Sequence, residues 1–78
     1  MEITKEMVIE EINNVINGFN PVENNRTNII NAELTLGKFF ALMELLFKID
    51  VNAYVELADS TKEQRDMLFS ITEKIYKL

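Results

Sequence analysis

Residues 35–49 read Thr-Leu-Gly-Lys-Phe-Phe-Ala-Leu-Met-Glu-Leu-Leu-Phe-Lys-Ile, and this stretch decides the fold. In a helix, at about 100° per residue, its apolar side chains cover roughly two thirds of the circumference. Thr35 is a suitable N-cap for such a helix. Because a helix that is apolar this far round needs neighbours on several sides, we predict that residues 35–49 form the core helix.

A helix is also predicted over residues 4–18. Its apolar residues recur at spacings of three and four, and form a stripe that consists of Val8, Ile9, Ile12, Val15, Ile16 and Phe19. Gly18 offers a left-handed C-terminal residue, and Asn20-Pro21 prevents the helix from resuming at once. The helix is therefore expected to end near residue 18.

Residues 20–34 separate these two helices and contain five asparagines and the only proline. We interpret them as an irregular linker, although fifteen residues are long for a loop in a compact domain. Ile29 and Ile30 either anchor the linker on the core or belong to a short helical turn. A short strand is a further alternative.

Two more helices are predicted after the core helix, over residues 51–58 and 61–77. Asp50 can cap the first of them, and Ser60-Thr61-Lys62-Glu63 has the form of a capping box for the second. The inward stripe of the last helix is Met67, Leu68, Ile71, Ile75 and Leu78. The sequence thus predicts one all-α domain over residues 1–78, a small bundle of three main helices plus one short helix.

The composition excludes several classes of chemistry. The chain has no cysteine and no histidine, so disulfides, thiolate or imidazole metal sites and histidine acid–base catalysis are absent. Thirteen acidic and eight basic residues give a formal charge of -5, and no segment collects the positive charge that phosphate backbones require. We expect no direct nucleic-acid binding, no signal peptide, no membrane span and a cytoplasmic location.

The sequence also offers no set of catalytic or metal-binding residues. Asp50 and Asn52 stand at the first and third positions of a calcium-binding loop, but Val55 replaces its required glycine and Thr61 its required glutamate. The carboxylates fall on polar helical strips or at caps rather than in pairs. We therefore predict no enzymatic activity, no metal and no cofactor.

Two groups of residues are candidates for binding a partner. Phe69 and Tyr76 lie seven residues apart on the side of the last helix opposite its inward stripe, with Arg65 beside them; they either bind a partner or pack against residues 22–30. The first helix presents an acidic surface, formed by Glu6, Glu10 and Glu11. Such a surface confers solubility, or imitates nucleic acid and blocks a basic cleft.

The core helix also indicates self-association. Its apolar residues form two ridges: Leu36, Phe40, Met43 and Phe47 on one side, and Leu42, Leu46 and Ile49 on the other. Covering both ridges requires two layers, which come either from the flanking helices or from a second copy of the chain. We expect a homodimer.

The function that we expect from the sequence is stoichiometric inhibition or regulation of another protein. Asparagine and isoleucine each occur nine times, which is typical of genomes rich in A and T and fits a phage or mobile-element product. A counter-defence factor such as an anti-CRISPR protein would be of this kind. The alternatives are a structural or assembly subunit of a larger complex, an immunity protein and a nucleic-acid-mimicking inhibitor.

Overall fold

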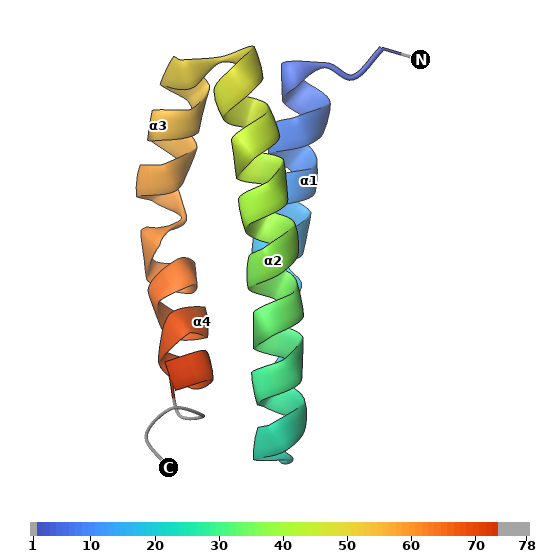
Figure 1. The fold of residues 1–78 in the computed structure, drawn as a ribbon, viewed down its shortest axis with the longest axis vertical. Coiled ribbons are helices and arrows are strands. Elements are labelled where there is room, and N and C mark those ends of the chain that lie inside the picture. The colour runs from blue at the N-terminus through green and yellow to red at the C-terminus, as the bar shows by residue number, and fades with distance from the viewer. Residues whose placement is uncertain (1, 74–78) are drawn as a thin grey trace.

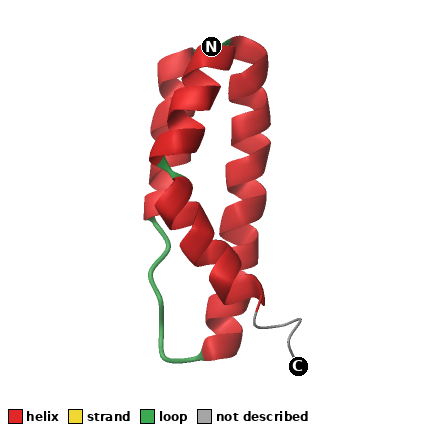
Figure 2. Cartoon of the chain, turned by 90° about the vertical axis from the view of Figure 1, so that its left-hand side faces the viewer, coloured by secondary structure: helices red, strands yellow, loops and turns green. Residues whose placement is uncertain are grey.

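The computed structural model describes residues 2–73, which contain four helices: α1 (Lys5–Asn17), α2 (Asn25–Ile49), α3 (Val51–Ser60) and α4 (Lys62–Glu73). No strand occurs in this range, so the predicted all-α class is confirmed for it. α1, α2 and the arm formed by α3 and α4 run side by side along the long axis (Figure 1). Figure 2, turned by 90°, shows the arm in front of the other two helices, and α1 and α2 pack against each other.

α2 is the central element and packs against each of the other three helices. Its buried residues alternate between spacings of four and three, which puts them on one side of the helix: Ala32, Leu36, Phe39, Met43 and Leu46. The other helices add Val8, Ile12, Ile16, Leu57 and Leu68 to the same core. Each large side chain that is removed from water in this way stabilises the fold by about 1.5–3 kcal/mol.

α1 lies within the range predicted for the first helix, and Thr4 caps it by accepting a hydrogen bond from the N–H of Met7 (3.2 Å). The expected left-handed residue at its end is wrong, because Gly18 has φ -81° and ψ -6°. Position 18 requires glycine for a different reason, which is that the backbone leaves no room for a side chain. A Cβ on Gly18 would lie 2.7 Å from the carbonyl oxygen of Asn14.

The predicted linker over residues 20–34 is wrong for most of its length, since α2 begins at Asn25. Its N-cap is Asn24, whose side-chain oxygen accepts from the N–H of Thr27 (3.1 Å), and Thr35 lies inside the helix. The loop is braced by Asn28, which accepts from the N–H of Val22 and donates to its carbonyl oxygen, both at 2.7 Å. Asparagines that suggested an irregular chain therefore cap and brace the start of a helix.

The predicted capping box at Ser60 is also wrong, because Ser60 is the last residue of α3 rather than the cap of α4. The hydroxyl of Ser60 donates to the carbonyl oxygen of Leu57 (3.2 Å), and the buried hydroxyl of Thr61 donates to the same atom (2.8 Å). Both hydroxyls thus bond back to α3 instead of forming the predicted cap. The predicted end of the last helix, near residue 77, lies outside the described residues.

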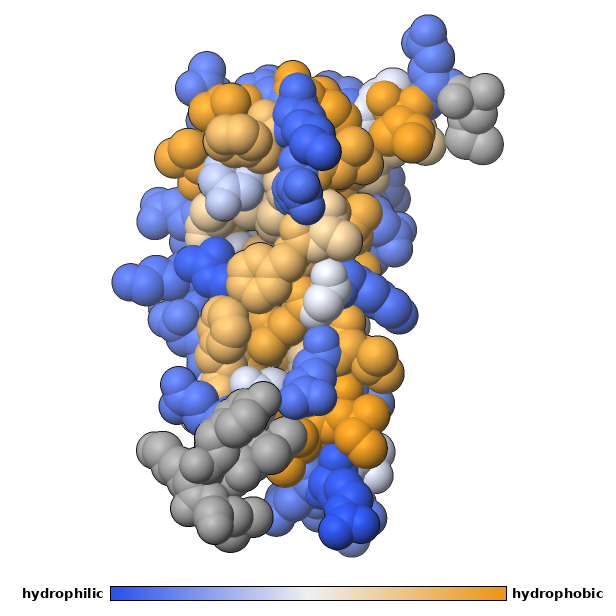
Figure 3. All heavy atoms as spheres, viewed as in Figure 1, coloured by the Kyte–Doolittle hydropathy of each residue, from blue (hydrophilic) through white to orange (hydrophobic). Residues whose placement is uncertain are grey.

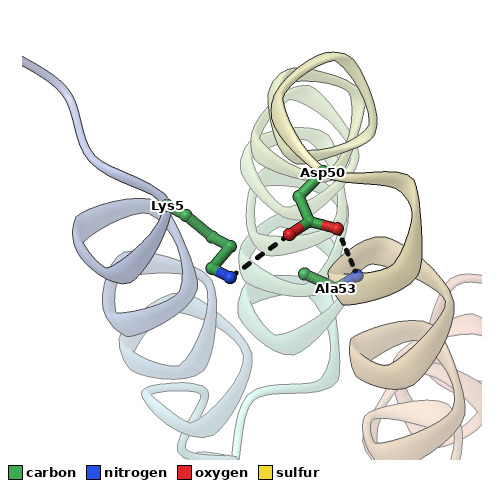
Figure 4. A network of polar contacts seen from close by, with 3 residues as sticks. All are labelled: Lys5, Asp50 and Ala53. Carbon is green, nitrogen blue, oxygen red and sulfur yellow. Dashed lines mark hydrogen bonds and ion pairs between the residues drawn. The ribbon is translucent and has the colours of Figure 1, made fainter.

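Asp50 terminates α2 and begins α3 at the corner shown in Figure 4. One carboxylate oxygen accepts from the N–H of Ala53 (3.1 Å) and the other is 3.2 Å from the Nζ of Lys5, which ties the corner to the start of α1. The hydrogen bond from Ala53, assisted by the Lys5 ammonium, lowers the pKa of the Asp50 carboxyl below its ordinary value.

We expect Asp50→Asn to lower stability at neutral pH and to have less effect in acid. A carboxyl with a lowered pKa in the folded state stabilises the protein above its unfolded-state pKa of about 4, and this stabilisation is lost as the pH falls through the folded-state value. Urea unfolding at pH 7 and at pH 2.5 measures the difference. Lys5→Gln, which keeps the cap, should show a smaller loss with the same pH dependence. An equal loss of stability in Asp50→Asn at both pH values would contradict the assignment of Asp50 as a charged helix cap.

Candidate protein-binding surfaces

Four aromatic side chains form two ring pairs where α2 meets α3 and α4, and we call them the aromatic surface: Phe40, Phe47, Tyr54 and Phe69. The rings of Phe40 and Phe69 have centroids 5.8 Å apart, and those of Phe47 and Tyr54 5.3 Å apart in an edge-to-face arrangement. Both distances are in the range of favourable aromatic pairs. α2 therefore contacts α3 and α4 through ring pairs at the rim of the core.

The three phenylalanine rings are only about half covered. Phe40 is 46% exposed, Phe47 52% and Phe69 39%. A groove of about 320 Å³ lies beside Phe40 and Phe47, away from Phe69, and is lined by Phe40, Met43, Glu44, Phe47 and Tyr54. Figure 3 shows hydrophobic atoms gathered in a band over α2 and the α3–α4 arm, with hydrophilic side chains mostly along the edges.

The position of the aromatic surface follows from the spacing on α2. Phe40 and Phe47 are seven residues apart, which is two helical turns, so both point to the same flank of the buried stripe. Phe39 turns into the core and is fully buried, while the ring of Phe40, 5.4 Å away, turns toward the α3–α4 arm. The α3–α4 arm covers this flank only in part, since both rings remain about half exposed.

One ion pair borders the aromatic surface. Lys48 and Glu44 stand four residues apart on α2, with Nζ and Oε1 at 3.7 Å, and both side chains are largely exposed. An exposed pair at this spacing stabilises a helix by about 0.3–0.5 kcal/mol at most.

The predicted apolar site is placed only in part by the structure. Phe69 belongs to the aromatic surface, and Tyr76 lies outside the described residues. Arg65 is half-buried, and its Nη1 donates to the carbonyl oxygen of Ala58 (3.2 Å) across the break between α3 and α4. Within its own chain Arg65 therefore holds the two halves of the arm together. Met67, predicted to point inward, is 43% exposed.

The acidic surface lies on α1. Glu6, Glu10 and Glu11 are all exposed, and Glu6 and Glu10 stand one turn apart on the side opposite the buried stripe of Val8, Ile12 and Ile16. Glu11 projects about 100° further round the helix. The buried stripe of α1 packs against α2, so Glu6 and Glu10 point away from α2, whereas the aromatic surface lies where α2 meets α3 and α4.

The site residues predicted from the sequence do not include Phe40 and Phe47, which the sequence places on a ridge of the core helix that either the flanking helices or a second copy of the chain would cover. The sequence does contain a signal for them, since that ridge and the one with Leu46 cannot both face a single neighbouring layer. The structure buries Leu46 completely and leaves Phe40 and Phe47 half exposed.

The structure of residues 2–73 also bears on two other features, a metal site and a membrane-spanning helix. Within residues 2–73, no three carboxylate, histidine or cysteine side chains lie close enough together to hold a metal ion. None of the helices in this range combines the length and the hydrophobicity that crossing a bilayer requires. Asp50, at the start of the segment compared with a calcium loop, is occupied as a helix cap.

Comparison with known proteins adds no family to this description. No protein-family model matches the sequence, and no similar curated protein or solved structure was found. The functional argument therefore depends on the two surfaces.

Proposed function

We propose that this chain is a small protein-binding module, built as a bundle of three main helices and one short helix, that inhibits or regulates another protein stoichiometrically. The observation that carries the proposal is the aromatic surface. Three phenylalanine side chains are 39–52% exposed on it although they touch other rings. Aromatic residues in contiguous exposed patches are characteristic of protein interfaces, where burying them provides most of the binding energy.

The acidic surface supports the same proposal from the other side of the molecule. Glu6 and Glu10 project from α1 into solvent, and the chain as a whole carries a charge of -5. Such a surface attracts a basic partner over a distance of about one Debye length, roughly 8 Å at physiological salt. We propose it as the contact for a target with a basic cleft, such as a nucleic-acid-binding protein that a phage or mobile element needs to block.

Glu6→Lys/Glu10→Lys is expected to reduce target binding at least tenfold, because it replaces two attractive charges by two repulsive ones. The measurement is affinity purification of the tagged chain from the cells that encode it, with the retained protein quantified at 50 and 300 mM salt. Glu63→Lys/Glu73→Lys is the matched control, since it makes the same change in net charge at exposed positions on α4. Equal retention by the two double variants would exclude the acidic surface as the contact.

A second candidate function is a structural or assembly subunit, favoured by the same half-exposed rings if they are buried permanently in a larger particle. The two functions differ in the state of the chain in the cell. A subunit should elute entirely with the particle, whereas an inhibitor should also be found free and should form a complex of fixed stoichiometry when its target is added.

A further inference from the structure

We infer that Asn17-Gly18, at the end of α1, is a site of spontaneous deamidation, and that its product adds a carboxylate to the acidic surface. The reaction converts a neutral side-chain amide into a carboxyl group and consumes only water. Its chemistry is independent of the proposed function, whereas its effect on binding rests on that function. The charge of the acidic surface then increases with the age of the chain.

Deamidation at Asn17 proceeds through a cyclic imide. The backbone nitrogen of Gly18 forms a bond to the side-chain carbonyl carbon of Asn17, the bond from that carbon to the side-chain nitrogen breaks, and ammonia leaves with the proton of the Gly18 N–H. Water then opens the imide at either carbonyl carbon, which leaves aspartate or isoaspartate. Glycine favours ring closure because it has no Cβ beside the attacking nitrogen. The fold itself requires this glycine, since a Cβ on it would lie 2.7 Å from the carbonyl oxygen of Asn14.

Both reacting groups are free in the structure. Asn17 is the last residue of α1 and is exposed, and its side chain makes no hydrogen bond within residues 2–73. The N–H groups that follow α2 and α3 donate to the carbonyl oxygens of Leu46 and Leu57, but the N–H of Gly18 has no such backbone acceptor in the described range. Helix ends also fray at low cost. Asn17 can therefore leave its helical conformation and bring its side chain onto the Gly18 nitrogen.

The other eight asparagines lack this combination of features. Asn20 precedes the only proline, which has no N–H to attack with. The side chain of Asn24 caps α2, and both amide atoms of Asn28 are held by hydrogen bonds in the loop. The remaining asparagines are all followed by residues that carry a side chain. Asn17 is thus the residue at which deamidation should be fastest.

The product changes the acidic surface because of where residue 17 lies on α1. At about 100° per residue, it lies within roughly 20° of both Glu6 and Glu10 around the helix axis. An aspartate carboxyl is ionised at neutral pH, so deamidation extends the acidic surface by one charge along the same side of the helix. The new charge also stands at the negative end of the helix dipole, where a carboxylate is unfavourable. We therefore expect a stronger attraction for a basic partner and a looser last turn.

Mass spectrometry of peptides from the purified chain, incubated at pH 8 and 37 °C, tests the chemistry. Asn17 should deamidate at least ten times faster than any other asparagine and within tenfold of its rate in urea, where the helix is unfolded. Asn17→Gln should abolish the reaction, because the longer side chain closes a ring poorly. Asn13→Gln, the matched control one turn earlier on α1, should leave it unchanged. The inference is overturned by a faster reaction at another asparagine, or by an Asn17 that deamidates in urea and is unchanged in the folded chain.

Affinity purification with Asn17→Asp tests the effect on binding. This variant should retain at least twice as much target as the unmodified chain at 50 mM salt, and the gain should disappear at 300 mM. Asn52→Asp adds the same charge at an exposed position on α3 and should give no gain. Equal gains in the two variants would overturn the effect on binding. Deamidation at Asn17 in a chain whose target is retained equally by Glu6→Lys/Glu10→Lys and its control would support the chemistry and contradict the proposed function, so the two can fail separately.

Discussion

Phe39→Ala is expected to lower the free energy of unfolding by about 3–5 kcal/mol, which is most of the stability of a domain of this size. The ring of Phe39 is fully buried at the centre of α2, among side chains from the other helices. Removing it loses the transfer free energy of the ring and leaves a cavity that the surrounding helices fill only in part. We expect little helical circular dichroism at 37 °C.

The neighbouring Phe40→Ala is the matched control for this prediction. It deletes the same atoms one position further along, at a side chain that is nearly half exposed. Urea unfolding of both variants, followed by circular dichroism, measures the difference, which should be at least about 2 kcal/mol because exposed rings lose less transfer free energy. Equal losses would show that Phe40 belongs to the core and would remove the basis of the aromatic surface.

Asn31→Pro is expected to cost about 3 kcal/mol or more, because Asn31 lies in the interior of α2. Proline removes the N–H that an interior residue donates four positions back, and its ring collides with the preceding turn. If residues 20–34 were an irregular linker, the same substitution at this exposed position would have little effect. Thermal unfolding therefore distinguishes the two descriptions of this segment.

Asn25→Pro provides the control for this substitution. Asn25 is the first residue of α2, where proline is favoured, and the preceding Asn24 has the extended backbone (φ -79°, ψ 110°) that proline requires of its predecessor. The variant should be as stable as the unmodified chain. A loss in Asn25→Pro as large as that in Asn31→Pro would mean that proline acts through the loop rather than through the helix.

Hydrophobic periodicity made the helices predictable where it was continuous. The spacing of Val8, Ile12 and Ile16 predicts α1, and the run from Leu36 to Leu46 predicts the centre of α2. The first turns of α2 could not be predicted in this way because Ala32 is their only buried residue and asparagines surround it. Asparagine favours loops and caps equally, so its frequency does not show where a loop ends.

The break between α3 and α4 shows a limit of a different kind. A serine three residues before a glutamate fits a capping box, but a hydroxyl can also donate to a carbonyl oxygen in the preceding turn. Ser60 and Thr61 both make the second type of bond, to Leu57. The direction of such a bond depends on how the preceding helix ends, which the local sequence does not record.

The candidate site was predictable in chemistry but not in position. The aromatic side chains and the acidic side chains of α1 can be read directly from the sequence, and Phe69 was correctly recognised as lying away from the buried Leu68. That Phe40 and Phe47 face the uncovered flank of α2 depends on where the α3–α4 arm crosses it. That Arg65 bonds to Ala58 depends on the break in the arm.

The most direct test of the account is whether the exposed rings of Phe40 and Phe47 contact the target. The measurement is the NMR signal loss that a soluble paramagnetic agent causes, in the chain alone and in its complex with the protein recovered by affinity purification. Val55, which is comparably exposed in the single chain, provides the reference signal. The account predicts that the two rings are as accessible as Val55 in the free chain and are protected in the complex. Rings that remain as accessible as Val55 in the complex would contradict it.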